Sequence, residues 1–145
     1  MNQDLRHYYF KKILKALNYL EFTYEKVKNL PTDPQVLTNE QLEIWDGFVA
    51  RFARLSDIFL SKYIKAAVKA DDPAFDGVFR DYLNRAEKMA LINTIEPWLE
   101  IRELRNVMVH EYNDEDLKLL FEKMLLHTPL LIELKVKLAN ANQGK

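Results

Sequence analysis

The sequence predicts an all-α protein, folded as an up-and-down antiparallel bundle of four or five helices. Apolar residues recur every three or four positions along most of the chain, and no run alternates apolar and polar residues as a strand does. The connections between these periodic segments are short, so consecutive helices fold back on one another and bury their apolar faces together. A chain of 145 residues, 48% of them hydrophobic, suits a single domain over 1–145.

The first two predicted helices are the clearest. The pattern Thr38-x-x-Gln41 is a capping box, and it predicts the start of a long second helix that ends near 71–73. The lysines of the first helix fall off its apolar stripe, and we interpret them as a solvated face. The core-facing stripes are Leu5, Tyr9, Ile13, Leu17, Leu20, Tyr24 and Val27 in the first helix and Leu42, Trp45, Val49, Phe52, Leu55, Phe59, Tyr63 and Ala67 in the second.

The second half of the chain predicts shorter helices. A third helix is expected over 76–91, and a fourth begins within 94–97 and continues through 103–112. Asn113 is a good N-cap for the last helix, with acidic residues in its first turn. Pro129 interrupts the apolar stripe of that helix, so we expect a kink there.

Composition excludes several classes of protein. The chain has 21 basic and 22 acidic residues, a formal charge of −1, which does not favour broad binding to nucleic acid. It has no cysteine and three scattered histidines, so we expect neither disulfides nor a metal site. No phosphate-binding glycine loop appears, and we expect no cofactor. Neither a signal peptide nor a membrane span is evident, so we expect a cytoplasmic protein without membrane contact.

The segment 103–112 places four reactive or hydrogen-bonding side chains, those of Arg105, Asn106, His110 and Tyr112, in a predicted helix. They share one side of that helix, while its apolar residues lie towards the other. Such a helix can be buried by its apolar face and still present a polar site. An Arg and a His near a helix end also commonly satisfy terminal carbonyls and the helix dipole, without any chemistry.

The segment resembles the Arg-x4-His-x-Tyr signature of the HEPN superfamily, in its HepT-like toxin branch. Arg105, His110 and Tyr112 match the three fixed positions, and Asn106 fits the preference of the superfamily for a polar residue after the Arg. The resemblance implies the same helical bundle, with the motif helix near its end. It also implies a hydrolase, namely a metal-independent ribonuclease that is the toxin of a toxin–antitoxin system.

Under this interpretation Arg105, Asn106 and His110 are catalytic. His suits proton transfer near neutral pH, so His110 would deprotonate a 2′-hydroxyl or protonate the leaving oxygen. Arg offers paired donors that match a phosphate, so Arg105 would stabilise the charge of the transition state, while Asn106 holds the phosphate or orients His110. Because one His per chain supplies one proton-transfer group, the resemblance implies a homodimer in which two motif helices face each other.

The same resemblance assigns Tyr112 and the partner. In HepT-like toxins the matching tyrosine is adenylylated (AMPylation) by a minimal nucleotidyltransferase that acts as the antitoxin. The added phosphate and adenine would exclude the RNA substrate from the cleft. An interfacial aromatic with a hydrogen-bonded hydroxyl is the plainer interpretation of Tyr112.

Charged residues of the second helix complete the predicted site. Arg51, Arg54 and Asp57 fall where intrahelical ion pairing is the plain expectation. The resemblance instead suggests that Asp57 orients Arg105, that Arg51 or Arg54 widens a basic, RNA-binding cleft, and that Arg102 adds positive charge to the same side.

Two other classes of function remain open at this stage. If the cleft binds phosphate without cleaving RNA, the chain is a non-catalytic nucleotide- or substrate-binding subunit of a nucleotidyltransferase partner. If the polar residues serve folding alone, it is a plain dimeric helical scaffold.

Overall fold

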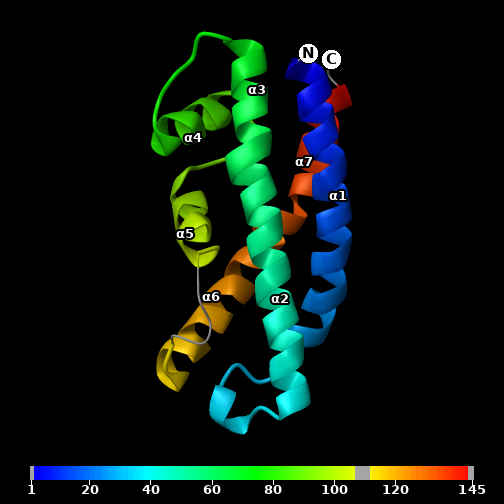
Figure 1. Cartoon of the computed structure of the whole chain (residues 1–145), viewed down its shortest axis with the longest axis vertical. Helices are drawn as coiled ribbons and strands as arrows, with labels where there is room; N and C mark the ends of the chain where they lie inside the picture. The colour runs from blue at the N-terminus through cyan, green and yellow to red at the C-terminus, as the bar shows by residue number, and fades with distance from the viewer. Residues whose placement is uncertain (1, 107–111, 144–145) are drawn as a thin grey trace.

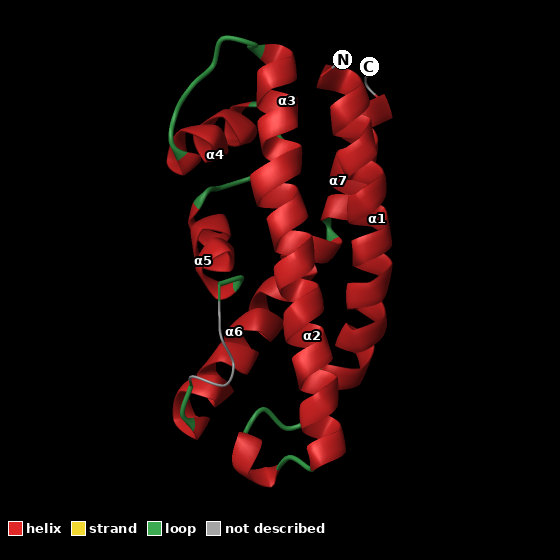
Figure 2. Ribbon diagram, in the orientation of Figure 1, coloured by secondary structure: helices red, strands yellow, loops and turns green. Residues whose placement is uncertain are grey.

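The computed structural model of the protein describes residues 2–106 and 112–143 (Figure 1). This part of the chain is helical almost throughout and contains no strand (Figure 2), which confirms the all-α prediction. A short 3₁₀ turn, η1 (Pro34–Val36), precedes the second helix, and a π-helical turn, η2 (Ile58–Tyr63), follows it. The α-helices are α1 (Asn2–Val27), α2 (Asn39–Asp57), α3 (Ile64–Asp71), α4 (Phe79–Lys88), α5 (Glu96–Leu104), α6 (Asp114–Ile132) and α7 (Leu134–Gln143).

The helices form the predicted up-and-down bundle (Figure 1). The chain runs down in α1 and up through α2, η2 and α3. It then returns through α4, which lies across the bundle, and α5, and it runs up again through α6 and α7. The two termini therefore lie at the same end. Helix α1 packs along α2, η2 and α3, while α6 packs against α2, α5 and α1. In the part of the chain that the structure describes, no helix is both long and apolar enough to span a bilayer.

Aromatic side chains join the helices at the centre of the bundle. Trp45 of α2 stacks on Phe121 of α6 with ring centroids 4.1 Å apart, and Phe59 of η2 lies 4.9 Å from Trp98 of α5. All four side chains are buried. The predicted stripes supply most of the core, but Leu5 is exposed while the neighbouring Arg6 is buried, so the stripe of α1 begins later than predicted.

Helices α2, η2 and α3 form one continuous helical rod. Its start matches the predicted capping box, because Thr38 Oγ1 accepts from the Gln41 N–H at 3.1 Å and Gln41 Oε1 accepts from the Thr38 N–H at 2.9 Å. The segments of 19, 6 and 8 residues together span about 50 Å. The rod ends at Asp71, as predicted. The π-helical turn in its middle was not predicted; the apolar stripe passes through it at intervals of four residues, from Leu55 to Phe59, Tyr63 and Ala67, a spacing that an α-helix also uses.

Helix α4 is shorter than the 76–91 helix that the sequence predicts. Its start is set by Asp81, whose Oδ2 accepts from the N–H of Val78 at 2.9 Å. Its end is set by Ala90, which has a φ of 62°, so that the N–H of Leu91 donates back to the Ala86 carbonyl at 2.9 Å. This left-handed residue closes the helix as glycine commonly does.

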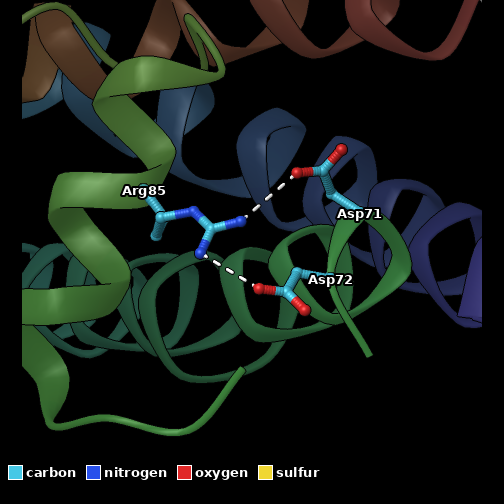
Figure 3. Close-up of polar contacts among 3 residues, drawn as sticks. All are labelled: Asp71, Asp72 and Arg85. Atoms are coloured by element: carbon cyan, nitrogen blue, oxygen red, sulfur yellow. Dashed lines mark hydrogen bonds and ion pairs between the residues drawn. The ribbon is translucent and has the colours of Figure 1, made fainter. Parts of the chain in front are cut away.

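Arg85 ties α4 to the end of the rod (Figure 3). Its Nη2 lies 3.4 Å from Asp71 Oδ2 and its Nη1 lies 3.3 Å from Asp72 Oδ2. The three side chains thereby fix the angle at which the chain turns back along the bundle.

The last helices begin as predicted. Asn113 caps α6, with its Oδ1 accepting from the Asp116 N–H at 2.8 Å. Helix α6 continues through Pro129, the residue at which the sequence predicts a kink, and ends at Ile132. Glu133 separates α6 from α7 one turn after this proline.

Candidate functional site

The polar segment predicted as a helical site begins where α5 ends. Helix α5 stops at Leu104, and Arg105 and Asn106 lie in a turn whose N–H groups donate to the Ile101 and Glu103 carbonyls. The prediction that the helix carries these two motif residues is therefore wrong. His110 lies outside the described residues, so its predicted stacking with Asn106 does too. Tyr112 lies in a bend before α6, with 39% of its side chain exposed.

Arg105 is held by two residues of the α2–η2 junction. Its Nη1 donates to Asp57 Oδ1 and, at 3.2 Å, to Ser61 Oγ. Asp57 and Ser61 are four residues apart on the rod, so both point towards the end of α5. The contact predicted between Asp57 and Arg105 is thus present. Arg105 Nε is buried and finds no acceptor within the described chain, so the guanidinium retains an unused donor beside its ion pair.

Arg105 lines a hollow of about 280 Å³ that we call the Arg105 hollow. It lies between the rod, α4 and α5, and among its described lining residues are three cations and no carboxylate. The Arg102 guanidinium lies 4.0 Å from the centre of the Phe79 ring, and Lys65 Nζ lies 5.8 Å from that of Tyr82, so aromatic rings position both. The described lining is Leu60, Ser61, Lys65, Gly77, Phe79, Tyr82, Arg102 and Arg105.

A second hollow, which we call the α1–α2 groove, lies on the other side of the rod and measures about 420 Å³. Its wall contains one carboxylate, that of Asp57, so the Asp57–Arg105 ion pair stands between the two hollows. We refer to Lys12, Lys15, Arg54 and Lys62 as the groove cations and to Tyr9 and Tyr19 as the groove tyrosines; Ala16 and Ile58 complete the lining.

The predicted supporting arginines separate into two locations. Arg102 lies beside Arg105, as expected. Arg51 and Arg54 instead face α1 and do not line the Arg105 hollow. Arg51 donates to the Tyr19 carbonyl at 3.0 Å and to the hydroxyl of Thr23, which ties α2 to α1. Arg54 lines the α1–α2 groove together with Asp57, and Arg51 lies beside Arg54 in a smaller adjoining hollow.

Sequence reasoning missed two residues of the Arg105 hollow and the second hollow altogether. Ser61 and Lys65 follow Asp57 at intervals of four, a spacing that could have placed them on the same face. The lysines of α1 were interpreted as a solvated face, because nothing local indicates that two of them meet Arg54 and Lys62 across a groove.

His127, which has no partner that the sequence pattern indicates, is buried and bonded to Glu100. The hydrogen bond from His127 is the main cause that lowers the pKa of Glu100 below its ordinary value of 4.5, and Lys123 nearby acts in the same direction. This contact joins α6 to α5 and positions the helix that precedes Arg105. We assign it a structural role.

The described residues contain no cluster of three metal-ligating side chains. The fold and the site define a helical bundle with a cationic hollow at the end of α5 and a second basic groove across the rod. Comparison with family models, curated proteins and solved structures finds no match for this chain.

Proposed function

We propose that this chain is a metal-independent HEPN-type ribonuclease, the toxin of a toxin–antitoxin pair, with Arg105, Asn106 and His110 as its catalytic residues. One observation carries the proposal. Arg105, the first residue of the motif, is held by Asp57 and Ser61 at the wall of a hollow with three cations and no carboxylate among its described lining residues. A phosphodiester is the ligand that such a wall suits, because arginine presents paired donors to phosphate oxygens.

The reaction needs one base, one acid and one charge stabiliser. His110 takes the proton of a ribose 2′-hydroxyl, whose oxygen then attacks the adjacent phosphorus. Arg105 stabilises the negative charge of the phosphorane, and Asn106 donates to one of its oxygens. The bond to the 5′-oxygen breaks, and that oxygen takes up a proton. The products carry a 2′,3′-cyclic phosphate and a 5′-hydroxyl, and no metal ion takes part.

A homodimer supplies the second proton-transfer group. One motif provides a single His, whereas the reaction removes one proton and delivers another. A twofold axis beside the end of α5 would bring two copies of His110 to one composite cleft, because a twofold interface is self-complementary. The Arg105 hollow would then belong to a larger cleft with six cations, a density that favours bound RNA over a chain of net charge −1.

Tyr112 is the proposed point of control by the antitoxin. Its partly exposed side chain directly precedes the N-cap of α6, so its hydroxyl is accessible to a partner. A minimal nucleotidyltransferase would transfer AMP from ATP to the phenolic oxygen and release pyrophosphate. The bound AMP adds negative charge and bulk near Arg105, and both exclude a phosphodiester. Because such a toxin acts on cellular RNA, the proposal places the protein in the cytoplasm.

The test is incubation of the purified, unmodified protein with a mixed RNA substrate in EDTA. Wild type should cleave and leave 2′,3′-cyclic phosphate ends, while His110→Ala and Arg105→Ala should each lose about a hundredfold or more of the rate. Arg80→Ala is the matched control, because Arg80 is an exposed arginine of α4 outside the Arg105 hollow. Equal loss in Arg80→Ala, or cleavage that requires a divalent metal, would contradict the proposal.

A non-catalytic nucleotide-binding subunit of a nucleotidyltransferase partner is the second candidate. The described wall of the Arg105 hollow favours it, because its cations and hydroxyls suit a nucleotide phosphate and its aromatic rings suit a base, while none of these groups ordinarily transfers a proton near neutral pH. Titration calorimetry with ATP distinguishes the two. Binding that Arg102→Ala and Arg105→Ala weaken, in a protein whose Tyr112 is unmodified by mass and which cleaves no RNA, would select the binding subunit.

A further inference from the structure

The α1–α2 groove concentrates positive charge on a chain that is nearly neutral overall. Four cations line it against one carboxylate, and that carboxylate is already bonded to Arg105. Within the described chain none of the groove cations forms an ion pair with an acidic side chain, whereas Lys28, Lys123 and Lys135 do. Unpaired cations that face one another repel, and this repulsion is relieved when an anion binds between them. The groove is therefore suited to an extended anionic ligand.

Two aromatic rings accompany these cations. Tyr9 and Tyr19 are ten residues apart on α1, about 15 Å along the helix axis, and both line the groove. Tyr19 keeps 44% of its side chain exposed, although its ring is held by the guanidinium of Arg51, 5.4 Å from the ring centre. A smaller hollow of about 190 Å³ continues the groove past this ring. An exposed ring between cations offers a base a surface on which to stack.

We propose that the α1–α2 groove binds single-stranded RNA, with the groove cations holding the phosphates and the groove tyrosines stacking on bases. The volume of about 420 Å³ lies within the range of small-ligand pockets, enough for a nucleotide unit at a time. A duplex keeps its bases paired and stacked inside, so it cannot offer them to the tyrosines. An acidic peptide would satisfy the cations but would leave the rings unused.

The ion pair of Asp57 and Arg105 forms a wall that the groove shares with the site proposed for cleavage. Asp57 lines the groove on one side of the rod, and its partner Arg105 lines the Arg105 hollow on the other. A strand that lies in the groove is thereby brought next to the proposed catalytic arginine. The choice of RNA as the ligand rests on the proposed function, whereas the site itself rests on the groove.

Fluorescence anisotropy with a labelled oligonucleotide tests the site. The probe is 2′-O-methyl oligouridine of about 12 nucleotides, within the known site sizes of single-strand binders. Because it has no free 2′-hydroxyl, it reports binding without cleavage. Wild type should bind with a salt dependence that Lys12→Ala and Arg54→Ala each make shallower by about 0.7 in log–log slope. Tyr19→Ala should weaken binding roughly five- to a hundredfold, and Tyr19→Phe, which keeps the ring, should bind as wild type does.

Matched controls distinguish binding of the probe in the α1–α2 groove from non-specific electrostatic attraction to the chain. Lys11→Ala removes the same charge from the neighbouring position of α1, which does not line the groove, and should leave the affinity unchanged. An equal loss in Lys11→Ala and Lys12→Ala would overturn the proposal, as would unchanged affinity in the Lys12, Arg54 and Tyr19 variants of verified fold. Displacement of the probe by double-stranded RNA as effectively as by single-stranded RNA, or binding of ATP in its place, would also overturn it.

The outcome is independent of the cleavage assay. If the protein cleaves no RNA but binds the probe in a way that the groove variants weaken, RNA binding in the groove is supported and the ribonuclease proposal is contradicted. If the groove variants change neither metal-independent cleavage nor probe binding, the ribonuclease proposal is supported and RNA binding in the groove is contradicted.

Discussion

Replacement of Asp57 by Asn tests how Arg105 is held at the end of α5. The substitution keeps the size of the side chain and one acceptor oxygen but removes the negative charge. Arg105 then keeps its bond to Ser61 and loses its counter-charge. We expect a less stable protein whose Arg105 side chain is less constrained.

The size of the expected loss of stability follows from the solvent exposure of the Asp57–Arg105 ion pair. The Asp57 side chain is 46% exposed and that of Arg105 is 21% exposed, so the pair is neither fully solvated nor buried. Two unit charges about 4 Å apart attract by about 1 kcal/mol in water and about 4 kcal/mol at an effective dielectric constant of 20. Desolvation and lost side-chain entropy offset most of this attraction. We expect Asp57→Asn to lower the free energy of unfolding by about 1.5 kcal/mol, of which about 1 kcal/mol is coupling to Arg105.

Urea unfolding followed by far-UV circular dichroism measures both quantities. A double-mutant cycle of Asp57→Asn with Arg105→Gln isolates the coupling energy, and the single change should lower the Tm by about 3–6 °C. Asp46→Asn is the control, since Asp46 is an exposed acid of the same helix with no ion pair in the described chain. A coupling energy below about 0.3 kcal/mol, or an equal cost in Asp46→Asn, would refute the reasoning.

Three further predictions concern the frame around the site. Ala90→Gly should raise the free energy of unfolding by about 0.5–1 kcal/mol in urea titration, because a φ of 62° strains alanine but not glycine; a loss of stability would contradict this. Thr38→Ala should lower the free energy of unfolding by about 1 kcal/mol, while Thr38→Ser should retain most of it, since either hydroxyl accepts from the Gln41 N–H. Glu100→Gln should cost stability above pH 4.5 and progressively less below it, measured as Tm against pH. The bond from His127 depresses the pKa of Glu100 in the folded state. The contribution of this bond to stability is therefore lost as the pH falls through the depressed pKa; a constant Tm difference would contradict this.

The bundle was predictable because its elements carry their own local signals. The capping box at Thr38, the N-cap at Asn113 and the buried stripe through Trp45 each depend on residues within one helix, and each is confirmed. Helix boundaries were less predictable where the chain uses an uncommon device. Ala90 ends α4 in a left-handed conformation that sequence patterns associate with glycine, so the predicted helix continued too far.

The site was predictable only in part, because it is assembled from segments far apart in the chain. The partner of Arg105 is 48 residues away, and only the family resemblance suggested it. The placement of Arg51 and Arg54 against α1 depends on which face α2 turns towards its neighbour, and the spacing within α2 alone does not specify that neighbour. Interhelical hollows such as the α1–α2 groove leave no pattern within either helix.

A formal charge of −1 conceals a strong polarity of this molecule. A hollow of about 440 Å³ with three carboxylates and one lysine, Lys118, lies at the end of the bundle opposite the two termini (Figure 1); its carboxylates are those of Asp33 and of Asp114 and Glu115 in the first turn of α6. The 19 residues of α2, about 28 Å, separate η1 from Asp57 and its two basic hollows. This length exceeds the Debye length of about 8 Å at physiological salt, so the acidic end does not neutralise the cations of the groove. An approaching polyanion is attracted to the groove and repelled from the acidic end, and the net charge predicts neither effect.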